Sequence, residues 1–305
     1  MGSGSWTSKD FESYSSSLGR SVTSSGHVDI SSYHGVQDMY KSTCLKDNLN
    51  PRNITFRECC DSDEHPNTIA VIFAMDETGS MGRAAMEVSS KINEVMVNLY
   101  KQIADIEFCV MGIGDIHYDD APIQMSQFES DIRIVQSLDD IYFERGGGGN
   151  GYESYSAAWY MAARHTKLDC WKRGKKGIII STGDEPLNPY LDRFELQKFT
   201  GDNLQGDIET SDIFKEVSEK YEVYHIYVDH DGGLYLEDAK KSFSKYLGNN
   251  FKVASINEIP QTIVNCIMDA CKKMEISTKP IITNDEESEV TNNDTSPFVM
   301  NTISW

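Results

Sequence analysis

Strand-sized apolar runs alternate with segments of helical period along most of the chain. The run at 69–75 is rich in β-branched and aromatic residues and ends in a polar turn, which is typical of a buried parallel strand. Residues 83–104 then place apolar side chains at i, i+3 and i+4, the period of an amphipathic helix. The same alternation continues downstream. Further strands are expected at 106–113, 132–135, 177–181, 223–228 and 251–253, and helices at 152–165, 211–221, 236–247 and 259–273.

Strands that alternate with helices predict a parallel or mixed sheet covered on both faces. We therefore expect an α/β fold at 68–275, doubly wound and Rossmann-like, with a mostly parallel central sheet flanked by helices. Residues 1–35 lack periodicity and predict a flexible Ser-rich arm. Residues 36–67 are expected to be a connector packing on the domain, with a short strand at 53–57. The polar, acidic residues 276–305 predict a mobile tail.

Composition bears on partners and location. The net charge of −20 argues against nucleic acid and anionic membrane as partners, because both require clustered Lys and Arg. No run approaches the ~20 apolar residues of a membrane-spanning helix. The N-terminus has neither the basic nor the apolar segment of a secretory signal, and the seven cysteines show no disulfide-framework spacing. We therefore expect a cytoplasmic protein with reduced thiols.

The polar turn after the first strand carries the most informative chemistry. Asp76 stands just past the apolar run, and hydroxyls follow at the second and fourth positions, Thr78 and Ser80. In open α/β sheets, ligands bind outside the carboxyl ends of the strands. Three hard oxygen ligands on one tight turn suit a divalent cation such as Mg²⁺. The alternative is an ordinary strand-to-helix turn in which Ser80 caps the helix.

Two further loops should converge on this turn if the sheet is doubly wound. The Gly-rich stretch 146–149 precedes Asn150 and Glu153 at the opening of a helix, and its glycines permit close backbone approach. Asp184 follows a short apolar strand, the same kind of position as that of Asp76. Two like charges brought this close repel and raise one pKa, a cost that a bound divalent cation removes.

The three loops together resemble a von Willebrand factor A domain with its metal-ion-dependent adhesion site, over about residues 68–273. More narrowly, blocks such as 76–82 and 146–155 resemble bacterial and phage proteins of the cytoplasmic type that contain this domain. The resemblance implies a bound Mg²⁺ (or Mn²⁺) ion. Its implied ligands are Asp76, Thr78, Ser80 and Asp184, with Asn150 or Glu153 where many members have a Thr.

The resemblance also implies a non-enzymatic module for protein–protein interaction. The ion would keep one coordination position open, and an acidic residue of a protein partner would fill it. Cytoplasmic members of the family act as adaptors for assemblies, which makes an AAA+ ATPase or another large assembly a candidate partner. The partner-binding residues expected around the ion are Glu77, Met81, Gly149, Gly151 and Glu185.

Two other functions stay open. The motif at 76–80 also resembles the aspartyl-phosphate motif of haloacid-dehalogenase-type enzymes. Asp76 would then be a covalent nucleophile, and Lys175 or Lys176 would clamp the phosphoryl charge. Against this, the Gly-rich loop has no role in that chemistry, and no nucleotide-binding motif is evident. The third alternative is a structural assembly component, such as a virion-associated protein, that uses the arm and the apolar end of the tail.

Other polar residues have simpler explanations. Asp115 and the pair at 119–120 follow the strand at 106–113 and could rim the same crevice, but an acidic surface loop is the simpler expectation. His165 on a helix is expected to be a packed histidine rather than a ligand.

Overall fold

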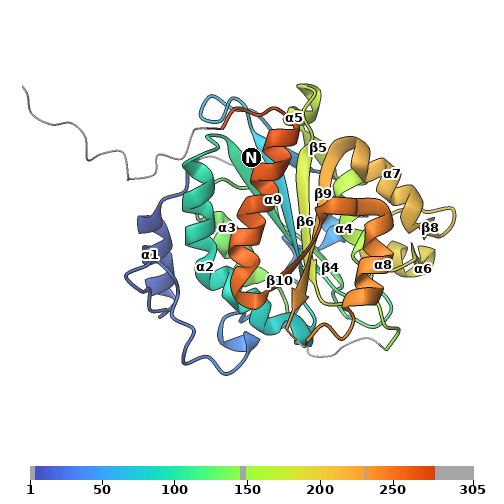
Figure 1. Ribbon diagram of the computed structural model, residues 1–305, viewed down its shortest axis with the longest axis horizontal. Helices are drawn as coiled ribbons and strands as arrows, with labels where there is room; N and C mark the ends of the chain where they lie inside the picture. The colour runs from blue at the N-terminus through green and yellow to red at the C-terminus, as the bar shows by residue number, and fades with distance from the viewer. Residues whose placement is uncertain (1–3, 145–148, 231, 279–305) are drawn as a thin grey trace, which may run out of the picture.

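A six-stranded sheet forms the centre of the protein, with strand order β10-β9-β6-β2-β3-β4 (Figure 1). The computed structural model describes residues 4–144, 149–230 and 232–278. Neighbouring strands run parallel, except that β4 pairs antiparallel with β3. The strands are β2 (Ile69–Asp76), β3 (Ile106–Ile113), β4 (Ile123–Met125), β6 (Gly177–Gly183), β9 (Tyr221–Asp229) and β10 (Phe251–Ser255).

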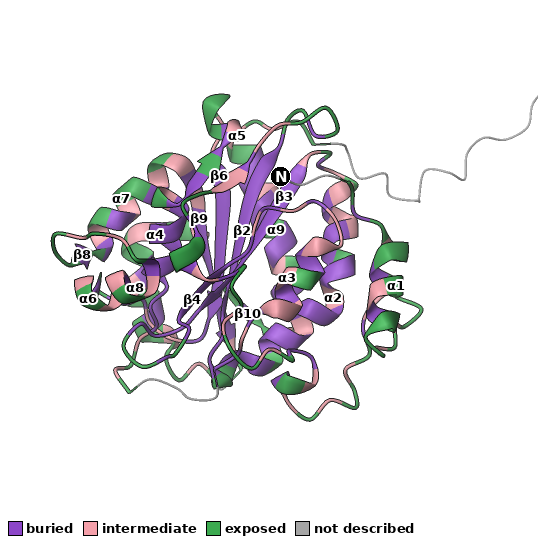
Figure 2. Ribbon diagram, turned by 180° about the vertical axis from the view of Figure 1, so that it is seen from behind, coloured by how far each residue is buried: buried purple, intermediate pink, exposed green. Residues whose placement is uncertain are grey.

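Helices cover both faces of this sheet (Figures 1 and 2). Helix α2 packs against α9 on one face, with α3 beside them, and α4 packs against α7 on the other, with α8 beside them. This arrangement confirms the predicted α/β fold with a mostly parallel central sheet. The helices are α1 (Ser8–Ser17), α2 (Gly82–Tyr100), α3 (Arg133–Asp140), α4 (Ser156–Arg164), α5 (Asp169–Lys172), α6 (Arg193–Thr200), α7 (Thr210–Lys220), α8 (Leu236–Leu247) and α9 (Ile259–Lys273).

Short elements connect the layers. Strands β1 and β5 pair in parallel, and β7 and β8 pair antiparallel. These strands are β1 (Arg57–Cys59), β5 (Thr166–Leu168), β7 (Tyr190–Leu191) and β8 (Ile208–Glu209). The 3₁₀ turns are η1 (Val36–Asp38), η2 (Pro51–Asn53), η3 (Gly79–Met81), η4 (Gly248–Asn250) and η5 (Ile256–Glu258).

The order of the strands reverses within the sheet. Every residue of β2, β3 and β6 is buried, as expected for strands covered on both faces. From β2 the chain moves outward through α2 to β3, and later returns to place β6 on the other side of β2. The strand order therefore reverses between β2 and β6. In doubly wound sheets the carboxyl ends at such a point leave room for a ligand.

One predicted strand is wrong. Residues 132–135 belong to the start of helix α3, not to a strand. Ile134 and Leu138 are buried at helical spacing, and the carboxylate of Asp131 accepts a hydrogen bond from the amide of Arg133 at 3.0 Å, which caps the first turn. The short strand expected at 53–57 is also displaced, since β1 begins at Arg57.

The N-terminal segment differs from the expected flexible arm, because it contains α1 and packs on the domain. Phe11 is fully buried, and the indole of Trp6 donates a hydrogen bond to Asn93 on α2 at 3.0 Å. Arg20 forms an ion pair with Asp139 at 2.8 Å. A few large apolar side chains thus anchor a segment that is otherwise polar. Most of the expected acidic tail, 279–305, lies outside the described residues.

Two further observations bear on location. None of the described helices has the length and apolar character needed to cross a membrane. All seven cysteines are free. The buried ones are Cys59, Cys109, Cys170, Cys266 and Cys271, which behave as small apolar side chains. The cytoplasmic location stays a prediction.

Candidate metal centre

Asp76 and Asp184 lie at the carboxyl ends of the adjacent strands β2 and β6. Asp76 is the last residue of β2, and Asp184 directly follows the last residue of β6. The parallel register pairs Met75 with Thr182, which brings the two strand ends side by side. Both residues therefore lie at the edge of the sheet where the strand order reverses, as the sequence predicts.

The carboxylate of Asp76 is almost fully buried and held on both sides. Its Oδ1 accepts hydrogen bonds from the amide of Thr78 at 3.0 Å and from the hydroxyl of Thr78 at 2.5 Å. Its Oδ2 accepts one from the phenol of Tyr155 at 2.7 Å. Burial and the charge of Asp184 raise the pKa of Asp76 to about 7, against the opposing effect of these hydrogen bonds.

The two hydroxyls of the turn lie close together and do not cap a helix. The hydroxyl oxygens of Thr78 and Ser80 are 3.4 Å apart. Helix α2 begins after Met81 with no side-chain cap, and Thr78 makes no cap bond at the start of η3. The helix-cap explanation of Ser80 is therefore wrong, and its exposed hydroxyl is available to a ligand.

Asp184 is buried but only half satisfied. Its Oδ2 contacts Nε2 of His230 at 2.8 Å, whereas its Oδ1 has no hydrogen-bond partner among the described residues. The neighbouring Glu185 is partly exposed, and burial together with the charges of Asp184 and Asp115 raises its pKa to about 7. A buried carboxylate oxygen without a partner is costly, so the site favours a ligand that neutralises it.

Glu153 lies beside the same carboxylates. It is 2% exposed, and its Oε2 has no partner among the described residues. Its amide donates to the carbonyl of Pro186 at 3.1 Å, which ties the middle loop to the loop after β6. Burial, followed by the charge of Asp76, raises the pKa of Glu153 to about 11.

The rest of the middle loop is only partly described. Asn150 accepts a hydrogen bond from the amide of Tyr152 at 3.5 Å, and no contact with Asp76 is seen among the described residues. Gly149 and Gly151 are exposed, and Gly151 has a φ of 75°, which favours glycine. The other glycines of the stretch, 146–148, lie outside the described residues.

Two of the expected partner-binding residues are inside the protein. Glu77 is fully buried and accepts a hydrogen bond from the side chain of Gln124. A Cβ atom on Gly112 would stand 2.0 Å from Oε2 of Glu77, so the strand itself makes room for this carboxylate. Neighbouring side chains at a strand end point to opposite sides, which turns Glu77 away from Asp76. Met81 is 2% exposed. Neither residue is available to a partner.

Sequence reasoning missed two polar residues of this region, Tyr155 and His230, and favoured a surface loop for a third, Asp115. Tyr155 donates to Asp76, His230 contacts Asp184, and Asp115 interacts electrostatically with Glu153 and Glu185. His230 follows β9, so the rule that ligands bind at the carboxyl ends of strands could have found it. Nothing in the local sequence marks Tyr155. Asp115 is fully buried and is not an ordinary surface residue.

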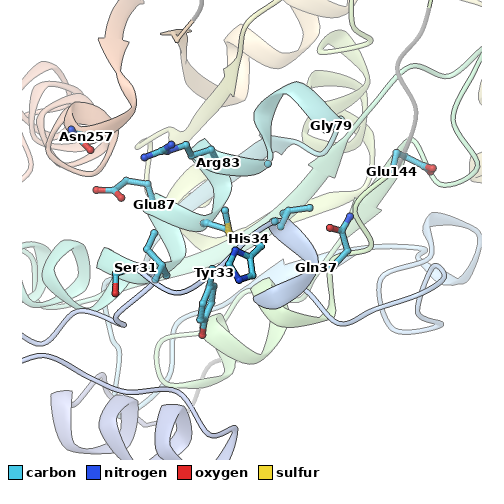
Figure 3. Close-up of a pocket in the computed structure, with 14 residues that line it drawn as sticks. Ser31, Tyr33, His34, Gln37, Gly79, Arg83, Glu87, Glu144 and Asn257 are labelled. Carbon is cyan, nitrogen blue, oxygen red and sulfur yellow. The ribbon is translucent and has the colours of Figure 1, made fainter.

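A separate cleft of about 1030 Å³ lies beside the start of α2 (Figure 3). The N-terminal segment and α2 form its walls, with Tyr33 and His34 opposite Arg83 and Glu87. Gly79 links it to the turn. None of the candidate ligand side chains lines this cleft.

The oxygen atoms present fit a small, hard cation. Across the described ranges, no group of three or more His, Cys, Asp or Glu side chains could hold a metal ion. Mg²⁺ does not need such a group, because it binds through one or two carboxylates and keeps several waters. Two buried carboxylates, two neighbouring hydroxyls and the unpartnered Oδ1 of Asp184 match that requirement.

The comparisons with known proteins concern the fold. No protein-family model matches the sequence, and no curated protein matches it. Solved structures similar to it include the pilus adhesin SpaC from Lactobacillus rhamnosus GG in its open conformation (14% identity, TM-score 0.46) and the vWF domain of the type V pili tip protein Mfa5 from Porphyromonas gingivalis (11% identity, TM-score 0.43). Proximal thread matrix protein 1 from the mussel byssus is also similar (14% identity, TM-score 0.39).

The extent of these matches differs. The match with SpaC covers 70% of this chain and 31% of SpaC, and that with the mussel protein covers 70% and 47%. The match with the Mfa5 domain covers 68% of this chain and 96% of that domain. This chain therefore spans about a third of SpaC. At these identities and TM-scores, no statement about ligand or partner rests on the likeness.

Proposed function

We propose that this chain is a protein-interaction module of the von Willebrand factor A type whose binding depends on a divalent cation. The observation that carries the proposal is the pair of buried carboxylates, Asp76 and Asp184, at adjoining strand ends, with Oδ1 of Asp184 unpartnered. A cation offsets the repulsion between these charges. The reversal of strand order between β2 and β6 places the pair where doubly wound sheets bind ligands.

The proposed cation is Mg²⁺ or Mn²⁺. Asp76, Thr78, Ser80 and Asp184 are its proposed ligands, and Glu153 is a third carboxyl group near enough to interact with Asp76. Asn150 stays a weaker candidate, because its observed contact is with Tyr152. When bound, such an ion supplies a coordination position at which water exchanges for an oxygen of a partner.

The proposed partner is a protein that offers an acidic side chain to the ion. Gly149 and Gly151 are exposed and Glu185 is partly exposed, and these three residues are proposed contacts for the partner. A large assembly such as one with an AAA+ ATPase, and a cytoplasmic location, are proposed from the family resemblance alone. The net charge of −20 disfavours nucleic acid and anionic membrane.

The phosphoryl-transfer alternative loses its charge clamp in this fold. Lys175 and Lys176 precede β6, whereas Asp76 ends β2. Because β2 and β6 are parallel, the lysines lie at the opposite edge of the sheet. Lys175 donates to the carbonyl of Met274 and Lys176 to that of Ser218. We therefore propose that the protein is not an enzyme, and expect purified protein to show no Mg²⁺-dependent phosphatase or ATPase activity that Asp76→Asn removes.

Affinity purification from the native host, with and without chelator, tests the proposal. We expect a partner to be captured with Mg²⁺ and lost with chelator. Thr78→Ala should weaken capture without unfolding the domain, because it removes a ligand near the surface and opens no core cavity. Thr55→Ala is the matched control, because Thr55 is exposed and is not one of the proposed ligands. A partner whose binding is unchanged by both chelator and Thr78→Ala would overturn metal-dependent recognition.

A further inference from the structure

Three tyrosines lie on loops and a short strand near the carboxyl edge of the sheet. Tyr118 is 59% exposed and Tyr190 is 36% exposed, while Tyr152 is half-buried. They come from the loop after β3, from the loop before α4 and from β7. We call these three residues the tyrosine rim. The proposed metal site uses none of them.

The members of the rim are neighbours in space. Burial raises the pKa of Tyr152, and interactions with Tyr190, Asp115 and Tyr118 raise it further. The hydroxyls of Tyr118 and Tyr190 have no hydrogen-bond partner within the described part of the chain. These two residues are the most exposed members of the rim, and the amide of Tyr118 donates to the carbonyl of Asp115 at 3.1 Å.

Hydrogen bonds fix the loops that carry the rim. The amide of Ile116 donates to the hydroxyl of Ser154 at 3.1 Å, which joins the loop after β3 to the middle loop. The amide of Ser156 donates to the side-chain oxygen of Asn188 at 3.1 Å. The amide nitrogen of Asn188 in turn donates to the carbonyl of Tyr190 at 2.8 Å. The rim is thus a preorganised surface, which lowers the entropic cost of binding.

Asp115 is fully buried and only partly satisfied. Its Oδ1 accepts a hydrogen bond from the amide of His117 at 2.8 Å, but its Oδ2 has no partner among the described residues. Asp115 interacts electrostatically with Tyr152, Glu153 and Glu185. The unpartnered oxygen therefore belongs to the group of acidic side chains that includes Glu153 and Glu185, near Tyr152 of the rim.

We propose that the tyrosine rim receives a lysine or arginine side chain of a protein partner, and that the buried carboxylate of Asp115 attracts this cation from beneath the rim. Aromatic faces attract cations, and the planar guanidinium of arginine also stacks on rings and pairs with carboxylates. The net charge of −20 supplies long-range attraction for a basic segment. Tyrosine and arginine are also enriched among the residues that dominate protein interfaces.

This inference goes beyond the proposed function, because it requires no metal ion. A partner segment that carries an arginine near its metal-binding carboxylate would contact both sites. The two contacts can be tested separately, because chelator removes only the contact with the metal ion.

The test measures binding of a fluorescent Gly/Ser-rich peptide with three arginines to the full chain in EDTA. A matched peptide has citrulline, which is neutral and of similar shape, at each arginine. We expect the arginine peptide to bind at least tenfold more tightly than the citrulline peptide. Tyr118→Leu with Tyr190→Leu should weaken arginine-peptide binding at least fivefold, whereas the corresponding double Phe variant should retain it, because the ring faces carry the interaction. Asp115→Asn should weaken it about tenfold.

Two control variants separate the rim from the general acidity of the protein. Glu219→Gln removes one exposed charge on α7, and Trp171→Ala removes an exposed aromatic ring on α5; neither should change peptide affinity by more than twofold. Thermal unfolding shows whether each variant is folded. If Asp115→Asn does not fold, the double variants of Tyr118 and Tyr190 alone test the proposal. Equal affinity for the two peptides, an unaffected double Leu variant, or equal losses for Glu219→Gln and Asp115→Asn would each overturn the proposal.

Discussion

The two edges of the central sheet differ in how their charged groups are satisfied. At the amino edge, Arg173 pairs with Asp61 and donates to the carbonyl of Thr68 at 2.7 Å, and Lys176 donates to that of Ser218 at 2.8 Å. At the carboxyl edge, buried oxygens lack partners in the part of the chain that the structure describes. These oxygens belong to Glu77, Asp115, Glu153 and Asp184.

The difference distinguishes stability from ligand binding. Buried polar groups are almost always hydrogen-bonded in folded proteins, and each exception calls for an explanation. At the amino edge, Arg173 and Lys176 follow the rule with partners from the protein itself, so their charges hold segments together. The buried carboxylate of Glu107, near the start of β3, is the exception among the described residues of that edge. At the carboxyl edge, the unpartnered oxygens are satisfied only when a cation or a partner supplies the missing charge. Residues at the two edges should therefore respond differently to substitution and to metal.

Gly183→Ala should have the largest effect, because it disturbs the carboxyl edge through the core. A Cβ atom there would stand 1.9 Å from the phenol oxygen of Tyr155. That ring is confined by His225 and Phe243, with ring centroids 4.9 and 5.7 Å away. We expect a loss of about 3 kcal/mol in the free energy of unfolding and at least tenfold weaker Mg²⁺ binding.

Urea unfolding and calorimetry measure these two effects. Gly206→Ala is the matched control, because nothing lies within 4 Å of a Cβ atom there. A Gly183→Ala variant as stable as the control would show that Tyr155 moves aside without cost, and would remove the packing argument for its position.

Arg173→Met should destabilise the protein without affecting the metal. The substitution keeps much of the side-chain volume but removes the bonds to Asp61 and to the carbonyl of Thr68. Hydrogen bonds to charged groups contribute about 1.5–3 kcal/mol, and we expect a loss toward the lower end, because the pair is partly exposed. Changed Mg²⁺ affinity in this variant would contradict the separation of the two edges.

Acid should destabilise the core near the carboxyl edge through His225. Burial lowers the pKa of this histidine to about 3 in the folded protein, against ~6.5 unfolded. The unfolded chain therefore binds more protons between these values. Stability from the neutral histidine is complete above pH 6.5 and is lost as the pH falls toward 3. At pH 5 the loss is about 2 kcal/mol.

Other groups also titrate in this range, so the test compares two chains. Burial raises the pKa of Glu107 to about 7, which acts in the opposite direction. Urea unfolding of the parent and of His225→Phe at pH 7 and pH 5 isolates the histidine. We expect the parent to lose about 2 kcal/mol more than the variant. Equal losses in both chains would contradict a neutral buried His225.

Thr78→Ala is expected to give the smallest effect on stability. It removes a hydroxyl that donates to Asp76 but leaves the amide bond to the same carboxylate. We expect a loss of about 1 kcal/mol and about tenfold weaker Mg²⁺ binding, measured by unfolding and by calorimetry. Unchanged metal affinity would remove Thr78 from the proposed ligands.

The sheet and part of the site follow from local sequence. The apolar run before Asp76 and the one before Asp184 mark buried strands, and polar residues directly after such strands must lie at one edge of a parallel sheet. The error at Glu77 arose from treating neighbouring positions as one surface, although alternation turns them apart. Helix α3 was missed because its short apolar pattern fits both the helical period and the strand period.

The rest of the site depends on tertiary contacts. Tyr155 reaches Asp76 from 79 positions away in the sequence, and His230 reaches Asp184 from 46 positions away. No local pattern encodes such distances. Asp115 looks like a surface residue in the sequence, and only the packing of three loops buries it.

Calorimetric titration of Mg²⁺ into metal-free full-length protein tests the central claim most directly. We expect binding at one site in the parent and its loss in both Asp76→Asn and Asp184→Asn, because each removes a carboxylate from the adjoining ends of β2 and β6. Asp212→Asn, an exposed position on α7, should bind as the parent does. If the Asp76 and Asp184 variants bind Mg²⁺ as tightly as the parent, the cation site is not at this edge and the account is wrong.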